Sequence, residues 1–257
     1  MANVKAEDLD LIILATVTPD RLFPATACVV QREIAAKKAW AFDLSAGCCG
    51  FLFGLATATQ MIESGRSSKI LVIGADVMSS IVDYTDRNTC ILFGDAAAAV
   101  LLDVCPEPDH GFLDFILRTD GSGEHLLYMN AGGSLRPPCA ESVANREHFV
   151  TQEGTSVFKV AVTEMANVSA EILEKNGITG QDIALFVPHQ ANLRIIDAAA
   201  KRMGIPHDRV VTNIERYGNT TAATIPLCLY EAIVERESAV KKGEFIVMSA
   251  FGAGFSW

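Results

Sequence analysis

Residues 39–65 read AWAFDLSAGCCGFLFGLATATQMIESG, and this stretch decides the fold that the sequence predicts. Residues 40–44 form a short apolar run that ends in small residues, which is typical of a buried strand. Residues 50–63 carry apolar groups on every face before a glycine stops the pattern, which predicts a buried helix. The tight turn between strand and helix holds two adjacent cysteines, Cys48 and Cys49.

Cys48 falls at the start of the predicted helix. Unpaired backbone N–H groups and the positive end of the helix dipole favour a thiolate there, so we expect the pKa of Cys48 to be lowered and the thiol to be nucleophilic. Free cysteine is also among the most buried residue types, so both cysteines could instead be small core residues. The stretch alone does not exclude Cys49 as the nucleophile.

The composition of the chain excludes several classes of protein. The chain has 257 residues, half of them hydrophobic, and a net charge of -10, which argues against a nucleic-acid-binding protein. The first residues, MANVKAEDLD, lack the basic and apolar regions of a secretory signal, and no uncharged apolar run approaches the length of a membrane span. The seven cysteines show no metal-ligand spacing, so the sequence predicts reduced thiols in a cytoplasmic enzyme without a metal.

The first half of the chain alternates between strands and helices. Apolar runs predict strands at residues 11–17 and 69–73, and a helix from Pro24 to Lys37 lies between the first strand and the 39–65 stretch. A turn at Gly94-Asp95 leads into a strand of small residues. From Pro106 to Glu153 periodicity is weak, which predicts an excursion of loops and short strands.

The second half repeats this order after an amphipathic helix over residues 158–175. DIALFVPHQAN parallels DLIILATVTPD, VVTNIERYGNTTAATIP parallels WAFDLSAGCCGFLFG, and EFIVMSAFGAG parallels KILVIGADV. Each half therefore reads as strand, helix, strand, helix, strand, with apolar strands suited to a sheet covered on both faces. This duplication predicts an α/β protein with a layered α/β/α/β/α body and pseudo-twofold symmetry.

That symmetry brings three polar side chains together. Asn219 occupies the turn equivalent to that of Cys48, and His189 follows a neighbouring strand, at the strand ends where ligands bind in such folds. A cysteine with a histidine and an asparagine supplies a nucleophile and two hydrogen-bond donors for a developing oxyanion. Taken singly, His189 and Asn219 also fit purely structural roles. The C-terminal AFGAGFSW would let backbone N–H groups approach a ligand.

Several motifs resemble one known family, in order and over practically the whole chain. They are DLSAGCCGF, FGDAAAAVLL, VFKVAV, VPHQANLRII, GNTTAATIP and FGAGFSW. Together they resemble the beta-ketoacyl-acyl carrier protein synthases III of the thiolase-like superfamily. The resemblance implies a duplicated thiolase-like fold, with an N-terminal half at residues 1–105, a connecting excursion at 106–157 and a C-terminal half at 158–257.

The resemblance also implies a reaction. Cys48 would take an acyl group from acyl-coenzyme A, most simply acetyl-coenzyme A, and malonyl-acyl carrier protein would then bind. His189 and Asn219 would stabilise the enolate formed by decarboxylation, which would attack the Cys48 thioester to give a 3-ketoacyl-carrier protein. The backbone N–H groups of Cys48 and Ala253 would form the oxyanion hole. No metal or other cofactor is implied, and position in the motif selects Cys48 over Cys49.

Motif matching extends to the binding residues. Phe23 resembles the residue that crosses the family's homodimer interface to border the partner's acyl pocket. A second set corresponds to the coenzyme A and pantetheine tunnel: Arg87, Phe158, Ala191, Asn192 and Phe251. A third set forms a basic patch suited to docking an acidic acyl carrier protein: Lys159, Arg194, Lys201 and Arg202.

The chain departs from the family pattern at its ends. It begins just before the second strand of the first half and stops at Trp257, so the first and last strands are missing. We therefore expect unpaired strand edges, exposed apolar surface and, for this polypeptide alone, poor solubility and weak activity. Alanine also stands at position 253, where the family usually has glycine. Two alternatives are a related condensing or acyl-transfer enzyme of secondary metabolism and a non-catalytic partner subunit.

Overall fold

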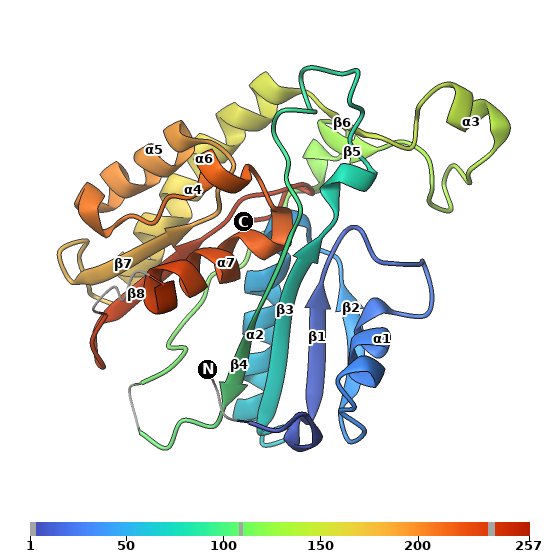
Figure 1. Cartoon of the computed structure of the whole chain (residues 1–257). Coiled ribbons are helices and arrows are strands. Elements are labelled where there is room, and N and C mark those ends of the chain that lie inside the picture. The colour runs from blue at the N-terminus through green and yellow to red at the C-terminus, as the bar shows by residue number, and fades with distance from the viewer. Residues whose placement is uncertain (1–3, 108–109, 236–239) are drawn as a thin grey trace.

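The computed structural model describes residues 4–107, 110–235 and 240–257, and its elements stack in layers (Figure 1). The first half forms a four-stranded sheet in the order β2-β1-β3-β4. Its strands are β1 (Leu11–Ala15), β2 (Trp40–Leu44), β3 (Lys69–Asp76) and β4 (Ala96–Asp103). β1 pairs in parallel with β2 and β3, whereas β4 runs antiparallel to β3. Every residue of β1 is buried, as its unbroken apolar sequence predicts.

The expected unpaired strand edges are found at the outer strands of this sheet, and its central strands are paired without a gap. β3 pairs directly with β4 along its whole length, from Lys69 opposite Asp103 to Asp76 opposite Ala96. This pairing extends β3 three residues beyond the predicted end at Ile73, because the small side chains of β4 allow close approach. The open edges of the sheet among the described residues are therefore its outer strands, β2 and β4.

Two helices flank these strands. α2 (Gly50–Glu63) has the predicted bounds, and α1 (Thr26–Glu33) is shorter than the predicted helix over residues 24–37. The carboxylate of Asp43 accepts hydrogen bonds from the backbone N–H groups of Thr26 and Ala27, both at 2.7 Å, which fixes where α1 begins. Ala35 has a left-handed φ of 57°, which ends the helical path before Lys37.

The second half forms a two-stranded parallel sheet of β7 (Ile183–Pro188) and β8 (Phe245–Ser249). Its helices are α4 (Gly154–Lys175), α5 (Leu193–Met203), α6 (Ile214–Tyr217) and α7 (Thr224–Tyr230), with a π-helical turn at Glu231–Glu235. α4 begins four residues before the predicted Phe158, because the side chain of Glu153 accepts a hydrogen bond from the Ser156 N–H and caps it.

One strand of the predicted duplication is reduced to a single pair. The counterpart of β2 survives as an isolated bridge between Val210 and Phe186. The chain turns away after Val211 because the side chain of the buried Gln190 accepts hydrogen bonds from the N–H groups of Asn213 and Ile214, at 3.0 and 3.2 Å. Sequence parallelism therefore overstated the strand content of the second half.

The segment between the halves is an excursion of loops and short elements, as predicted. It contains β5 (Leu127–Met129), paired antiparallel with β6 (Val150–Gln152), and the short helix α3 (Ala140–Ala144), which projects from the body of the molecule in Figure 1. The remaining short elements are single 3-10 turns, including Gly47–Cys49 and Thr221–Ala223. The division of the chain at residues 105 and 157 stays a prediction.

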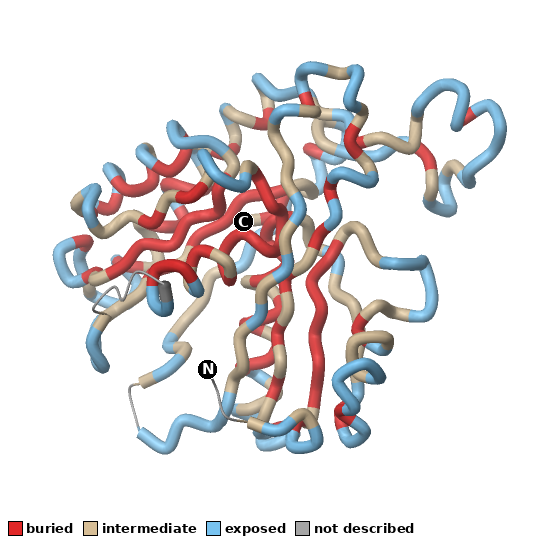
Figure 2. The backbone as a smooth tube through the Cα atoms, in the orientation of Figure 1, coloured by how far each residue is buried: buried red, intermediate tan, exposed pale blue. Residues whose placement is uncertain are grey.

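Three clusters of buried hydrophobic residues connect the layers. Their residues lie in the parts of the backbone that Figure 2 colours red, as buried. The central cluster joins β1, α2 and β3 to β7 and α7, so α2 and α7 lie between the two sheets. A second cluster packs α4 and α5 on the outer face of β7 and β8, and a third packs α1 on β1. The predicted α/β/α/β/α order is confirmed.

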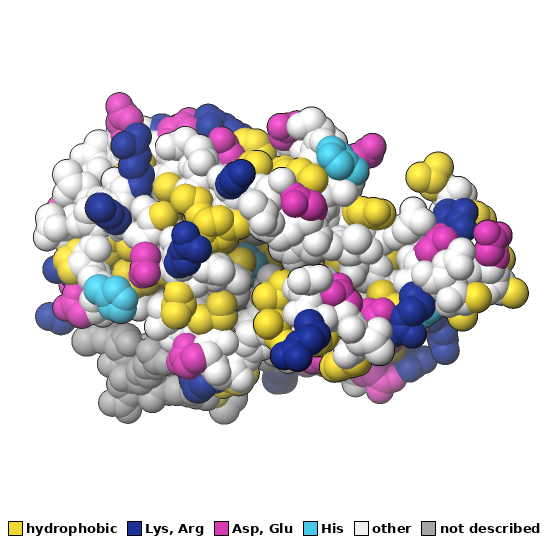
Figure 3. Space-filling view, turned by 90° about the horizontal axis from the view of Figure 1, so that it is seen from above, with side chains coloured by type: hydrophobic (Ala, Val, Ile, Leu, Met, Phe, Trp, Pro, Cys, Tyr) yellow, Lys and Arg dark blue, Asp and Glu magenta, His cyan; other side chains and the backbone are white. Residues whose placement is uncertain are grey.

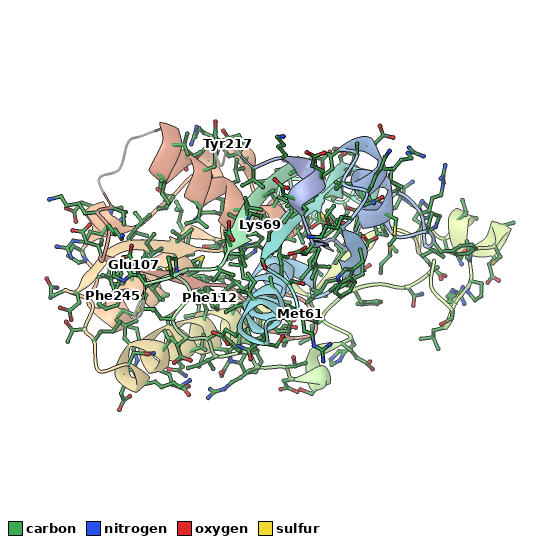
Figure 4. The ribbon with its side chains drawn as sticks, turned by 90° about the horizontal axis from the view of Figure 1, so that it is seen from below. Met61, Lys69, Glu107, Phe112, Tyr217 and Phe245 are labelled. Atoms are coloured by element: carbon green, nitrogen blue, oxygen red, sulfur yellow. The ribbon has the colours of Figure 1, made fainter. Side chains whose placement is uncertain are left out.

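The connecting segment contributes to the central cluster from below. Phe112 packs against it, as does Met61 of α2, and both are labelled in Figure 4. Lys242 and Glu107 form an ion pair nearby, which ties the segment before β8 to the one after β4. The two sheets are thus held in one body, and their carboxyl ends face a common cavity.

Candidate active site

A cavity of about 690 Å³ lies where elements of both halves meet. Cys48, His189 and Asn219 all line it, so the structure brings together the three side chains that the duplication predicted. They come from three different elements: the turn after β2, the end of β7 and the turn after α6. All three are buried, with exposed fractions of 8%, 1% and 9%.

Cys48 lies in the middle of the 3-10 turn Gly47–Cys49, which leads directly into α2. Gly47 has a φ of 52°, which a residue with a side chain adopts only with strain, and this lets the strand reverse tightly into the helix. Cys49 points away into the core, where its thiol donates to the carbonyl oxygen of Ser256 at 3.2 Å. Of the two adjacent cysteines, Cys48 is the one that lines the cavity.

The expectation that the pKa of Cys48 is lowered is wrong for the protein without substrate. Burial, together with the negative charge of Asp76, raises the pKa of Cys48 to about 12, and a hydrogen bond with Asn219 offsets part of that rise. A helix start contributes only about 0.3–1 kcal/mol, less than one pKa unit, so it does not overcome desolvation. Cys48 is therefore a neutral thiol at physiological pH.

His189 follows β7 and is fixed through its backbone. Its N–H donates to the carbonyl oxygen of Ser249, at the end of β8, at 2.8 Å. Within the described residues, neither ring nitrogen has a hydrogen-bond partner, although both are buried. Burial lowers the pKa of His189 to about 4, so the ring is neutral at physiological pH. A neutral imidazole with unsatisfied nitrogens facing a cavity is suited to hydrogen-bonding a ligand.

Asn219 is held at the crossing of two chain segments. Its backbone N–H donates to Leu92 O at 2.8 Å, and Gly94 N–H donates back to Asn219 O at 3.0 Å. Its side-chain oxygen accepts from the Thr221 N–H at 2.9 Å, which leaves the amide NH₂ as its donor towards Cys48. At Gly94 an added Cβ would lie 2.1 Å from the carbonyl oxygen of Tyr217, so this crossing requires glycine.

The C-terminal loop also reaches the site. Gly252 lines the cavity, and a Cβ at that position would lie 2.8 Å from both the Cβ and the backbone nitrogen of Cys48. Ala253, the predicted second backbone donor, lines a neighbouring cavity together with Gly47 and Ser256. The loop therefore presents Gly252, rather than Ala253, to the cavity that holds Cys48.

Most of the predicted substrate-binding residues line the cavity, namely Phe158, Ala191, Asn192 and Phe251. Arg87 is exposed, and its neighbour Asn88 lines the cavity. The wall also contains side chains that sequence reasoning missed, chiefly Leu92 and Phe93 before β4, and Met165 and Ile195 on α4 and α5. Their apolar character gave no signal, because core residues carry the same pattern.

The predicted basic patch divides into two parts. Lys159 and Arg194 line the cavity, and the Arg194 guanidinium stacks over the Phe158 ring, 4.7 Å from its centroid. Lys201 and Arg202 are exposed in the last turn of α5. Figure 3, seen from above, shows Lys and Arg side chains standing among apolar ones over the part of the molecule formed by α4 and α5.

Phe23, predicted to reach a partner subunit, lies on the loop between β1 and α1. Its side chain is 84% exposed, and so is that of Leu22. Two adjacent apolar side chains this exposed are unusual on the surface of a monomer. In Figure 1 the loop between β1 and α1 lies on the same side of the molecule as the open edge strand β2.

Asp76 was missed by the sequence analysis. It ends β3 with 2% of its surface exposed, and its carboxylate accepts hydrogen bonds from two other segments, including the N–H groups of Val17 and Ala222. The available signal was a single acidic residue at the end of the apolar run KILVIGAD.

Among residues 4–107, 110–235 and 240–257, no three His, Cys, Asp or Glu side chains cluster so that they could hold a metal ion. Within the same ranges, none of the helices combines the length and the apolar character needed to cross a membrane.

Comparison with known proteins gives one family. The model described as 3-Oxoacyl-[acyl-carrier-protein (ACP)] synthase III matches residues 42–121, and its C-terminal counterpart matches residues 173–257. The Beta-ketoacyl-[acyl-carrier-protein] synthase III of Chlorobium phaeobacteroides is 53% identical over 256 residues, which cover 99% of this chain and 77% of the relative. Beta-ketoacyl-[acyl-carrier-protein] synthase III 2 of Bacteroides thetaiotaomicron is 53% identical over 251 residues, 98% of this chain and 73% of the relative.

The fold agrees with this relationship. The crystal structure of 3-oxoacyl-[acyl-carrier-protein] synthase III from Aquifex aeolicus matches with a TM-score of 0.90 and 43% identity. The match covers all of this chain and 77% of the other, and it confirms the predicted thiolase-like fold. From its sequence motifs, its five-layer fold and these relatives, the chain belongs to the beta-ketoacyl-acyl carrier protein synthase III family.

Proposed function

We propose that this protein catalyses the decarboxylative condensation of an acyl-coenzyme A, most simply acetyl-coenzyme A, with malonyl-acyl carrier protein. The products are a 3-ketoacyl-acyl carrier protein, coenzyme A and CO₂, which makes the protein an acyltransferase that initiates fatty acid synthesis. The observation that carries this proposal is the meeting of Cys48, His189 and Asn219 in one cavity.

In the first half-reaction the sulfur of Cys48 attacks the thioester carbonyl. The carbon–sulfur bond to coenzyme A breaks, the acyl group remains on Cys48, and the cysteine proton leaves on the released coenzyme A thiol. The backbone N–H groups of Cys48 and Ala253 are the candidates for holding the tetrahedral oxyanion, since the N–H of Gly252 already donates to Ser256 O. Because the pKa of Cys48 is raised, substrate binding must precede deprotonation.

In the second half-reaction malonyl-acyl carrier protein loses CO₂ and forms an enolate. The neutral His189 ring donates one N–H and Asn219 donates its amide N–H, so the enolate oxygen has two donors and no positive charge is needed. The enolate carbon then attacks the acyl carbonyl and expels the Cys48 sulfur. Decarboxylation supplies the carbanion, so we propose that neither a metal nor another cofactor takes part.

The cavity walls support coenzyme A and pantetheine binding, and the basic side chains at its mouth support docking of an acidic carrier protein. Phe158 and Phe251 give the wall apolar surface, whereas Lys159 and Arg194 add positive charge at the opening. Lys201 and Arg202 extend this charge along α5. On a chain with a net charge of -10, such a cluster favours an acidic partner.

We also propose a homodimer and a cytoplasmic location. The exposed Leu22 and Phe23 and the open edge of β2 support the dimer, since unpaired strand edges and apolar loops are normally covered. Phe23 of one protomer would then border the acyl pocket of the other. The location rests on the family assignment and on the reduced state of Cys48, which the reaction requires.

Intact-mass measurement tests the reaction. We expect the protein to gain one acyl group from acetyl-coenzyme A or a longer acyl-coenzyme A, and to lose it as 3-ketoacyl-carrier protein when malonyl-acyl carrier protein is added. A Cys48→Ala variant is the control and should gain nothing. Loss of the acyl group to a different acceptor would identify another condensing or acyl-transfer enzyme. No acylation by any thioester would indicate a non-catalytic partner subunit.

A further inference from the structure

We propose that Asp76 is the positioning residue that sets the turn of Asn219 against the turn of Cys48. This inference rests on the proposed function, because it assigns Asp76 to the assembly of that site. Asp76 belongs to β3, which carries neither of the two residues, and it is almost fully buried. It does not line the cavity, so it acts through its neighbours.

One carboxylate oxygen of Asp76 accepts hydrogen bonds from the segment that follows β1. Its Oδ1 accepts hydrogen bonds from the backbone N–H groups of Val17 and Thr18, at 2.8 and 3.2 Å. The hydroxyl groups of Thr16 and Thr18 donate to the same oxygen, at 3.1 and 3.0 Å. The second oxygen of the side chain also accepts an N–H, so both of its polar atoms must be acceptors, which selects a carboxylate over an amide.

The other oxygen reaches the second half of the chain. Asp76 Oδ2 accepts from the N–H of Ala222 at 3.1 Å, and the preceding residue, Thr221, donates its N–H to the Asn219 side chain. Asp76 thus holds the end of the short turn in which Asn219 stands. Thr221 has a φ of 51°, an unfavourable conformation for a β-branched residue, so the turn needs such support to keep its shape.

The same turn packs against the Cys48 turn. A Cβ added at Gly50, two residues after Cys48, would lie 3.6 Å from the Cβ of Ala222 and 3.0 Å from that of Ala15. A Cβ at Gly74 would lie 2.2 Å from the carbonyl oxygen of Ala222. Ala222 is therefore fixed between the Cys48 helix and β3, and its hydrogen bond to Asp76 sets the direction of its backbone.

The charge of Asp76 gives a second consequence. The titratable groups around Cys48 are Asp76 on β3, His189 after β7 and Cys49 on its own turn. His189 is neutral and Cys49 is a buried thiol. Burial raises the pKa of Asp76, and the hydrogen bonds that its carboxylate accepts, including those from the Val17 and Ala222 N–H groups, oppose that rise and favour the charged form. The charge of Asp76 disfavours the Cys48 thiolate, so replacing Asp76 should change the ionisation of Cys48 as well as the shape of the turn.

The test compares Asp76→Asn with Asp10→Asn in the full chain. Asp10 is a matched control, because it also joins β1 to β3 by accepting backbone N–H groups, from Ser68 and Lys69, but at the opposite end of the sheet. Three quantities are measured: acylation by acetyl-coenzyme A, decarboxylation of malonyl-acyl carrier protein, and the pH dependence of Cys48 alkylation by iodoacetamide.

We expect Asp76→Asn to slow decarboxylation by about 10²-fold, the usual effect of a small displacement of an active-site group, and to slow acylation less. Its Cys48 should be alkylated about tenfold faster at a given pH, which corresponds to a pKa lower by one unit. Asp10→Asn should change neither the two half-reaction rates nor the alkylation of Cys48. Equal loss of both half-reactions with an unchanged alkylation profile would overturn the proposal.

Asp76→Glu covers the case in which Asp76→Asn does not fold. It keeps the charge and lengthens the side chain, so decarboxylation should fall while Cys48 alkylation stays as in the native protein, and unchanged decarboxylation would contradict positioning. The native protein separates this proposal from the function on which it rests. If the native chain is not acylated, the proposed function fails, whereas the alkylation profiles still report the effect of Asp76 on Cys48.

Discussion

Gly252 and Cys48 are packed backbone against backbone: a Cβ at position 252 would lie 2.8 Å from the Cβ and the backbone nitrogen of Cys48. The C-terminal loop that carries Gly252 is held by reciprocal backbone hydrogen bonds between Gly252 and Ser256, at 3.0 and 3.1 Å. Ser256 O also accepts the thiol of Cys49. The nucleophile's turn and the C-terminal loop therefore cannot move independently.

A Gly252→Ala substitution should consequently slow acylation of Cys48. The added methyl group must displace either the loop or Cys48, and we expect a loss of about tenfold or more in the acylation rate. Gly133→Ala is the control, since nothing lies within 4 Å of a Cβ there. Stopped-flow acylation with acetyl-coenzyme A measures both, and an unaffected Gly252→Ala rate would show that the loop yields freely.

Alkylation should select Cys139 before Cys48. Hydrogen bonds from Ser142 lower the pKa of the exposed Cys139, whereas burial raises that of Cys48 to about 12. At pH 8 about 10⁻⁴ of Cys48 is thiolate, roughly a thousandfold less than for an ordinary cysteine. Peptide mapping after brief iodoacetamide treatment should find Cys139 modified first. Faster labelling of Cys48 at pH 7 would indicate a thiolate and contradict the raised pKa.

Slow alkylation of Cys48 is thus compatible with catalysis. Labelling blocked by acetyl-coenzyme A remains informative, because acylation removes the thiol entirely. The rate of Cys48 labelling should rise about tenfold for each pH unit, without a plateau below pH 10. Such a slope distinguishes a high pKa from simple steric exclusion of the reagent, which would lower the rate without changing its pH dependence.

Stability should fall with acidity through His189. Its pKa is about 4 in the folded protein against 6.5 in the unfolded chain, so between these values the unfolded state binds more protons. Stability therefore rises with pH across this window, by at most about 3 kcal/mol from this residue. Urea unfolding of the native protein and His189→Asn at pH 4.5, 5.5 and about 7 checks it. As the pH falls, the free energy of unfolding of the native protein should decrease relative to that of His189→Asn. A difference between the two proteins that does not change with pH would contradict the lowered pKa of His189.

Charge reversal at Arg194 and at Lys201 should affect the two half-reactions differently. Arg194 lines the cavity and stacks on Phe158, so Arg194→Glu should impair acylation as well as carrier-protein use, with loss of a contact worth about 0.5–2 kcal/mol. Lys201→Glu, on the exposed end of α5, should weaken only carrier-protein use. Saturation curves for acetyl-coenzyme A and malonyl-acyl carrier protein measure both, and a matching defect in Lys201→Glu acylation would place docking elsewhere.

The apolar loop should control association. Leu22 and Phe23 are each 84% exposed, so replacing both by serine removes apolar surface that a partner protomer would bury. We expect the double variant to shift the protein from dimer towards monomer in analytical ultracentrifugation. A Leu135→Ser variant is the control, because this side chain is also exposed but lies on the connecting segment. An unchanged dimer in the loop variant would exclude this surface.

The order of the layers and the main reactive side chains could be predicted from the amino-acid sequence. Unbroken apolar runs predict strands that both faces of a sheet bury, and the repeated strand-helix order predicts two stacked halves. α2 matched its predicted bounds because its apolar residues suit a buried helix and Gly65, with a left-handed φ of 71°, follows its end. Cys48, His189 and Asn219 could be named because each stands directly beyond such an element, where the duplicated pattern places a polar residue among apolar ones.

The electrostatics of the site and its supporting contacts depend on how the elements pack, and no sequence pattern predicted them. The raised pKa of Cys48 depends on burial and on Asp76, a residue 28 positions away in the chain, and no local pattern contains that distance. Leu92 and Met165 line the cavity, but in the sequence they cannot be told from core residues. Apolar residues that line a cavity have the same spacing as those that fill a core. Position along the chain fixes which elements form, whereas packing between them fixes which groups face the site and how they ionise.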